Sequence, residues 1–184
     1  MGVRMQAPSR TLTDTAEEKA AERAAQRPVM ELARGDMALA AIGMAAAIIC
    51  VSGLAVVAEM PMVLGSFGSS CVLLFGYPKS PFCRPRNFIG GHMVSSAVGL
   101  ACLHVSGPEY WMMGVAVAAA FVAMQITGTI HPPAGGNPII LFLMNADWGF
   151  LWFPTLGGTV VVQAVALVHL WILRKRGSWP RSKR

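Results

Sequence analysis

Two short segments of this sequence combine helix-breaking residues with polar side chains, and both lie in apolar surroundings. They read GSFGSS at 65–70 and HPPAGGNP at 131–138. A residue that precedes proline avoids the helical region, and glycine allows backbone conformations that are closed to other residues. We therefore expect each segment to interrupt a helix and to leave backbone N–H groups without a carbonyl partner in the same helix.

A short helix should start in each segment. Asn137 is a typical N-cap for a helix over 138–145, whose first residue is proline. Ser69 or Ser70 would cap a matching helix that ends near Gly76. The N-terminus of a helix carries about half a positive charge together with its unpaired N–H groups. Two such ends facing each other would suit a small anion.

The candidate anion site combines both segments. Backbone N–H groups at 66–70 and 134–137 would bind the anion, and Ser69, Ser70 and Asn137 would add polar side chains. Neither segment contains Lys or Arg, so binding should be weak and should favour flux over tight capture. The predicted substrate-binding residues are Ser66, Phe67, Gly68, Ser69, Ser70, His131, Pro132, Pro133, Ala134, Gly135, Gly136 and Asn137.

Two histidines are candidates for gating or pH sensing. His131 sits at the break itself, and His92 lies in an apolar stretch, where an ionisable residue is a functional candidate. A working His131 would make transport depend on pH between about 5 and 8; the alternative is a hydrogen bond that only fixes the unwound chain. Catalysis would need a second acid, base, nucleophile or metal ligand, and no carboxylate lies inside a span. We therefore expect no catalytic residues, no metal site and no cofactor.

Charged residues are few and are concentrated at the two ends of the chain. The 184 residues are 54% hydrophobic and 13% charged, whereas a soluble domain carries about 25% charge. Residues 1–36 hold six basic and six acidic residues, 37–173 hold three of each, and 174–184 hold six basic residues. This distribution indicates an integral membrane protein whose basic tail contacts lipid headgroups rather than nucleic acid. We expect a cytoplasmic or interfacial charged helix within 1–36, a membrane domain over 37–173 and a cytoplasmic tail over 174–184.

The membrane domain divides into six apolar stretches, which predict an all-α integral membrane fold. Four stretches have the roughly 20 residues that a bilayer requires, and two are shorter. The long ones cover 37–58, 88–107, 110–129 and 150–173, and the short ones cover 61–76 and 131–145.

The basic residues favour six crossings with both termini in the cytoplasm. Lys79, Arg84 and Arg86 lie in the connection at 78–87, and the other connections between stretches carry only acids. If all six stretches cross, every basic connection falls on the cytoplasmic side, as the positive-inside rule requires. Four crossings with two re-entrant segments are the alternative.

An internal repeat relates the two halves of the membrane domain. An offset of 67 residues pairs Gly68 with Gly135 and gives nine identities over the 36 positions from 68 to 103. Two three-segment units in series must enter the membrane from opposite sides. The sequence therefore predicts inverted repeats over 37–107 and 108–173, a plan in which transporters place their sites near the midplane.

Three sequence blocks also resemble a known family. They are GSFGSSCVLLFG at 65–76, PRNFIGGH at 85–92 and MQITGTIHPPAGGNP at 124–138. Over about 37–173 the chain resembles the HPP family of integral membrane proteins, which is usually described with four spans. Its plant members look like chloroplast-envelope nitrite transporters, so the resemblance implies nitrite as the first candidate substrate. Many members continue the motif with an Ala-Thr-Ala-like stretch, whereas this chain has Gly-Asn-Pro at 136–138.

These observations predict a transporter or channel for a small inorganic anion in a bacterial cytoplasmic (inner) membrane. A channel for a small neutral solute is the first alternative, because helix-end dipoles also orient dipolar molecules. A membrane-embedded enzyme using His131 is a weaker one. A homo-oligomer is compatible with the sequence, which does not decide the oligomeric state.

Overall fold

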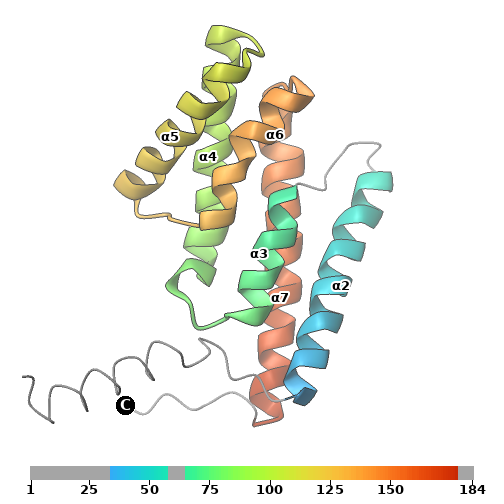
Figure 1. The fold of residues 1–184 in the computed structure, drawn as a ribbon. Coiled ribbons are helices and arrows are strands. Elements are labelled where there is room, and N and C mark those ends of the chain that lie inside the picture. The colour runs from blue at the N-terminus through green and yellow to red at the C-terminus, as the bar shows by residue number, and fades with distance from the viewer. Residues whose placement is uncertain (1–33, 58–64, 178–184) are drawn as a thin grey trace, which may run out of the picture. The chain divides into compact units, whose positions relative to one another are not determined.

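The computed structural model describes residues 34–57 and 65–177, and every regular element in these ranges is helical (Figure 1). The predicted all-α class is therefore confirmed for this part of the chain. Nearly all of the charged segment at 1–36, and the tail beyond 177, lie outside the described residues. The elements are α2 (Arg34–Val57), α3 (Gly65–Gly76), η1 (Pro81–Cys83), α4 (Pro85–Ser106), α5 (Tyr110–Thr127), η2 (Pro132–Gly136), α6 (Asn137–Met144), η3 (Leu151–Gly157) and α7 (Gly158–Lys175).

Within the described ranges, four helical stretches are long and apolar enough to cross a membrane, as the sequence predicted. They are Asp36–Val57, Pro85–Ser106, Tyr110–Thr127 and Leu151–Lys175. A helix suits the bilayer because it pairs its backbone groups internally where lipid offers no hydrogen bonds. The start of α4 is three residues earlier than expected, because the fixed φ of Pro85 suits the first position of a helix.

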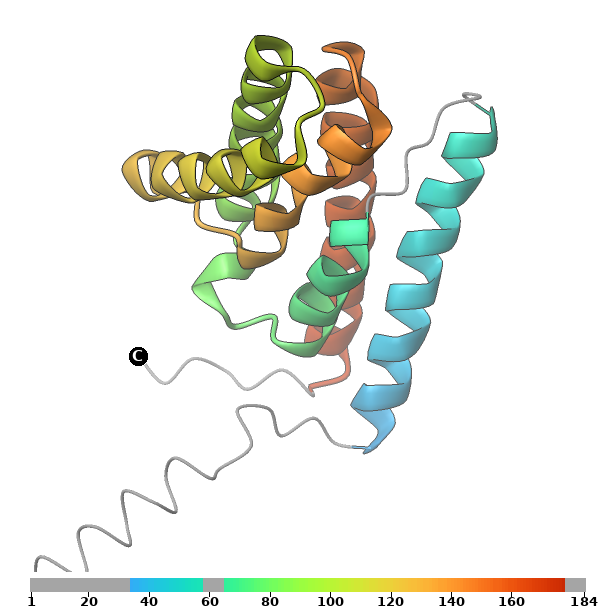
Figure 2. The same cartoon turned by 45° about the horizontal axis from the view of Figure 1, so that its top comes forward.

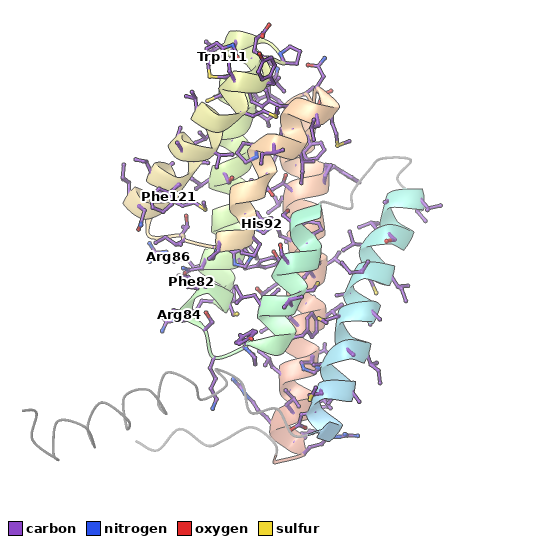
Figure 3. All side chains as sticks on the ribbon, in the orientation of Figure 1. Phe82, Arg84, Arg86, His92, Trp111 and Phe121 are labelled. Atoms are coloured by element: carbon purple, nitrogen blue, oxygen red, sulfur yellow. The ribbon has the colours of Figure 1, made fainter. Side chains whose placement is uncertain are left out.

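Successive helices run in alternating directions (Figure 1). In that view α2, α4 and α6 run upward, whereas α3, α5 and α7 run downward. The start of α2, the end of α7 and the connection between α3 and α4 lie toward the lower end. Figure 3 places Arg84 in that connection, Arg86 in the first turn of α4 and Trp111 at the opposite end. Figure 2 shows α2 beside α7 and away from α5, in agreement with the extensive packing of α2 on α7.

The helix α4 is central, and the chain around η2 and α6 packs against its small residues. Gly91, Ser95 and Gly99 recur every four residues and so lie on one face of the helix. A Cβ on Gly91 would lie 2.6 Å from a backbone carbonyl oxygen of the chain before η2, and one on Gly99 would lie 3.0 Å from the Cα of Pro138. Ser95 Oγ donates to the carbonyl of Ala134 at 2.7 Å. Small residues therefore permit the close approach, as in other membrane helix pairs.

The last spanning stretch is wider in its first turns than an α-helix. Residues Leu151–Gly157 form a π-helical stretch that contains Pro154. Proline has no N–H to donate, and its ring collides with the carbonyl four residues earlier. The widened stretch places Thr155 Oγ1 3.1 Å from Ser96 Oγ of α4. This element, which was not predicted from the sequence, continues directly into α7.

Candidate functional site

The first turns of α3 and α6 are joined by a buried hydrogen bond. Ser66 Oγ donates to Asn137 Oδ1 at 2.7 Å, and both side chains are buried. From this contact α3 and α6 run toward opposite ends of the bundle (Figure 1). The structure thus brings together the two segments that the sequence singled out.

Asn137 does not cap α6, contrary to the prediction. It is the first residue of the helix, with φ of −60° and ψ of −45°, whereas an N-cap has non-helical angles. The preceding 3₁₀ turn runs directly into α6, and the Asn137 N–H donates to the carbonyl of Ala134. The side chain instead binds other elements, because its Nδ2 donates to Ser96 Oγ at 2.9 Å and to the His92 carbonyl at 3.4 Å. Asn137 therefore links α6 to α3 and α4.

The predicted capping roles of Ser69 and Ser70 are also wrong. The helix α3 begins at Gly65, so both serines lie inside it. The segment contains no proline, and glycine alone only weakens a helix. Ser69 Oγ donates to the carbonyl of Ser66 at 3.0 Å. Ser70 is fully buried and faces the two histidines.

Several backbone N–H groups that were expected to bind an anion are paired within the protein. The N–H of Ala134 donates to the carbonyl of His131 at 2.9 Å, and the N–H of Asn137 donates to the carbonyl of Ala134. The N–H groups of Ser69 and Ser70 lie inside α3, where each donates to the carbonyl four residues earlier. Fewer backbone N–H groups are therefore available to bind an anion than the sequence predicted.

Ser70 connects the two histidines. Its Oγ lies 2.9 Å from His131 Nε2 and 3.5 Å from His92 Nε2. On the other side of each ring, His131 Nδ1 donates to the carbonyl of Phe82 at 2.9 Å and His92 Nδ1 donates to that of Phe88 at 3.1 Å. Both rings are fully buried, with their centroids 5.1 Å apart. Figure 3 shows His92 between the ribbons of the short helices and Phe82 in the connection below.

The predicted site residues fall into a buried group and an outer group. Phe67 packs against the ring of His92, with centroids 5.5 Å apart, and is part of the hydrophobic core. A Cβ added to Gly68, Gly135 or Gly136 would meet nothing within 4 Å. The buried members are Ser66, Phe67, Ser70, His131, Ala134 and Asn137, and the exposed or half-buried members are Gly68, Ser69, Pro132, Pro133, Gly135 and Gly136.

Several polar residues that position the site were not predicted from the sequence. Three of them are buried, namely Ser95, Ser96 and Thr155. Ser95 Oγ donates to the carbonyl of Ala134 in η2, and the hydroxyl groups of Ser96 and Thr155 bind each other. Asn87 Nδ2 donates to the carbonyl of Ile130 at 2.9 Å and so fixes the chain before η2. The available signal was the Ser-Ser pair one turn after His92, because hydroxyl groups inside a span usually seek a partner.

Comparisons with known proteins agree with this architecture. Residues 30–179 match the family described as "HPP, transmembrane region". A transmembrane protein of Dictyostelium discoideum is 35% identical over 131 residues, which cover 67% of this chain and 46% of the relative. A second transmembrane protein of that organism is 38% identical over 127 residues, or 64% of this chain and 40% of the relative.

The chain spans less than half the length of these curated relatives. No solved structure matches it significantly. The family match covers most of the chain and includes all four spanning stretches and both short helices. This integral membrane protein therefore belongs to the HPP transmembrane family, as the sequence blocks predicted.

Proposed function

We propose that this chain is a transporter or channel for a small inorganic anion, with nitrite as the first candidate. The observation that carries the proposal is the buried contact between Ser66 and Asn137, which joins the first turns of two short helices inside a bundle of spanning helices. Each first turn carries partial positive charge from its N–H groups. An anion that approaches this junction would be stabilised without a fixed cation, which favours rapid release.

Both short helices would cross the membrane together with the irregular chain beside them. Arg86 Nη2 donates to the carbonyl of Thr127 at 2.9 Å, so the end of α5 lies beside the start of α4. Phe142 of α6 is buried with Leu103, near the other end of α4. The chain over 128–145 thus passes from one end of α4 to the other, which supports a crossing rather than a re-entrant loop. In Figure 1, α2 and α3 likewise end at opposite sides of the bundle.

Two inverted repeats follow from six crossings. The 67-residue offset pairs α3 with η2 and α6, and it pairs α4 with η3 and α7. The same offset pairs Ser70 with Asn137, and both side chains are fully buried and face α4, where Ser70 Oγ lies 3.5 Å from His92 Nε2 and Asn137 Nδ2 donates to Ser96 Oγ. The paired elements run in opposite directions in Figure 1. These relationships support the inverted-repeat plan of transporters, with the discontinuous segments meeting at the site.

The orientation follows from charge. With six crossings, Arg84 and Arg86 lie on the same side as both termini, and the positive-inside rule assigns that side to the cytoplasm. We place the protein in a bacterial inner membrane and assign it transport rather than catalysis.

Flux through purified protein in liposomes tests this proposal. We would compare nitrite, nitrate, formate and chloride with the neutral solutes urea and glycerol, and subtract the flux of protein-free liposomes. Protein-dependent flux of nitrite or another small anion is expected. Flux of a neutral solute alone, independent of both membrane potential and pH gradient, would support the alternative channel. The absence of anion flux would refute the proposal.

A matched pair of glycine variants locates the pathway. Gly135→Val places a larger side chain in the open space beside the junction, and the bundle should still fold because a Cβ there meets nothing within 4 Å. Gly114→Val, at an equally open position on α5, is the control. Loss of flux in the first variant alone would place the pathway at the junction, whereas equal flux in both would exclude it from there.

A further inference from the structure

The two buried histidines have the same protonated nitrogen. His131 Nδ1 lies 2.9 Å from the carbonyl oxygen of Phe82, and His92 Nδ1 lies 3.1 Å from that of Phe88. A carbonyl oxygen only accepts hydrogen bonds, so each Nδ1 must carry a hydrogen. In a neutral ring the other nitrogen is then an acceptor. Both Nε2 atoms are therefore acceptors when the rings are neutral.

Ser70 supplies only one hydrogen to these two acceptors. Its hydroxyl hydrogen can point at His131 Nε2, 2.9 Å away, or at His92 Nε2, 3.5 Å away, but not at both. His92 Nε2 is the acceptor that receives no hydrogen, since its distance of 3.5 Å from Ser70 Oγ is beyond the usual range of a hydrogen bond. The arrangement of His92, Ser70 and His131 is thus one proton short of a complete chain of hydrogen bonds.

We propose that His92, Ser70 and His131 together bind one proton, which accompanies the anion through the membrane. The inference rests on the proposed transport function. A proton bound at His92 Nε2 donates to Ser70 Oγ, while the Ser70 hydroxyl hydrogen donates to His131 Nε2. If His131 Nε2 takes the hydroxyl hydrogen and Ser70 Oγ takes the proton from His92, the positive charge moves from one ring to the other. No atom is gained or lost, and the serine keeps one hydrogen throughout.

The surroundings of the pair favour an anion as its counterion. From α3, the apolar ring of Phe67 faces His92, and from α4 the ring of Phe88 lies about 5 Å from both histidines. From η1, the neighbour of Phe82 is Cys83, whose sulfur lies 3.2 Å from the carbonyl oxygens of Leu73 and Tyr77. The cation Arg86 of α4 binds the carbonyl of Thr127.

Neither histidine has an acidic hydrogen-bond partner among the described residues. A buried positive charge needs a partner of opposite sign. The transported anion would supply this negative charge by binding together with the proton. The anion and the proton would then cross the membrane together without net charge.

Protonation is measured first, without any substrate. Nitrogen-15 NMR of histidine-labelled protein in lipid nanodiscs reports the state of each ring nitrogen, and His104→Gln and His169→Gln variants identify the other two histidine signals. At alkaline pH we expect Nδ1–H in both His92 and His131. On acidification the two Nε2 signals should shift together as one shared proton binds. An Nε2–H form at alkaline pH, or two independent protonation steps, would overturn the inference.

Transport is measured second, as the initial rate of nitrite uptake under an inward proton gradient. The wild-type rate should rise by up to about tenfold for each unit by which the external pH is lowered, because this is the slope of a single proton-binding step. Ser70→Ala and His92→Gln should abolish this dependence. His104→Gln is the matched control, because His104 Nδ1 also binds the carbonyl four residues earlier on α4, and its dependence should equal that of the wild type.

The two measurements separate the two proposals. A shared proton in the NMR experiment without any anion flux would refute the transport function and leave the proton site in place. Anion flux that is unaffected by pH, with no shared protonation, would refute the proton site and leave the transport function in place. Equal pH dependence in the wild type and in Ser70→Ala would also refute the relay.

Discussion

The hydroxyl of Ser66 donates to the side-chain oxygen of Asn137 at 2.7 Å across 71 positions of the chain. The side-chain nitrogen of Asn137 donates its two hydrogens to Ser96 Oγ and to the backbone carbonyl of His92. One amide therefore holds α3, α4 and α6 together at the point where both short helices begin. Since buried polar groups are costly when unpaired, this arrangement fixes the relative position of the three helices.

We expect Asn137→Ala to destabilise the bundle more than Ser66→Ala. The first variant loses three hydrogen bonds, and the second loses one. Membrane hydrogen bonds contribute about 0.6 kcal/mol each on average, so losses of about 2 and about 0.6 kcal/mol are expected. Reversible unfolding in mixed micelles measures both values. Ser106→Ala, whose hydroxyl bonds only locally at the end of α4, is the control. A smaller loss for Asn137→Ala than for Ser66→Ala would contradict the central role of the amide.

We expect Gly91→Ala to destabilise the protein and Gly135→Ala to leave its stability unchanged. A Cβ at Gly91 would lie 2.6 Å from the Thr129 carbonyl oxygen and 2.8 Å from His131 Cβ, whereas a Cβ at Gly135 meets nothing within 4 Å. Overpacking of this kind costs about 1–3 kcal/mol. Thermal denaturation in the same detergent would show a lower midpoint for Gly91→Ala alone. Equal midpoints would mean that α4 and the break are not in close contact.

Single cysteines test the orientation. In a variant that lacks the four native cysteines, Arg84→Cys should react only with a reagent on the cytoplasmic side, and Glu109→Cys only with one on the opposite side. Both positions are exposed and lie at opposite ends of α4. Impermeant maleimide applied to intact cells and to inverted vesicles distinguishes the two sides. Labelling of both positions from the same side would exclude the proposed crossings.

The thiol of Cys83 should resist alkylation in the folded protein. Burial raises the pKa of Cys83 to about 11, although the Ser80 side chain lowers it slightly. The reactive thiolate is therefore scarce at neutral pH and increases only as the pH rises toward 11. Mass spectrometry after iodoacetamide treatment at pH 7.5 and 9.5 should find Cys83 unmodified, and unfolding in SDS should expose it. Rapid modification of the native protein at pH 7.5 would show that the thiol is accessible and ionised.

The sequence by itself determined the membrane class, the four spanning stretches and the non-helical backbone at His131, whereas the interruption expected at 65–70 is absent because these residues begin α3. These features depend on local properties, because a bilayer requires about 20 apolar residues in a helix and because a residue that precedes proline, here His131, avoids the helical region. His131 has φ of −136° and ψ of 103°, in agreement with that expectation. The family also followed from the order of three short sequence blocks.

The tertiary structure decided what the polar side chains bind. Local capping preferences assigned Asn137, Ser69 and Ser70 to helix ends, but no local rule includes partners 22 to 71 positions away. The close approach at Gly91 and Gly99 brings the break against α4. There a buried amide or hydroxyl is stabilised more by the groups of neighbouring helices than by its own backbone. The pairing of His92 and His131 through Ser70 therefore arises only when α3, α4 and the break are packed together.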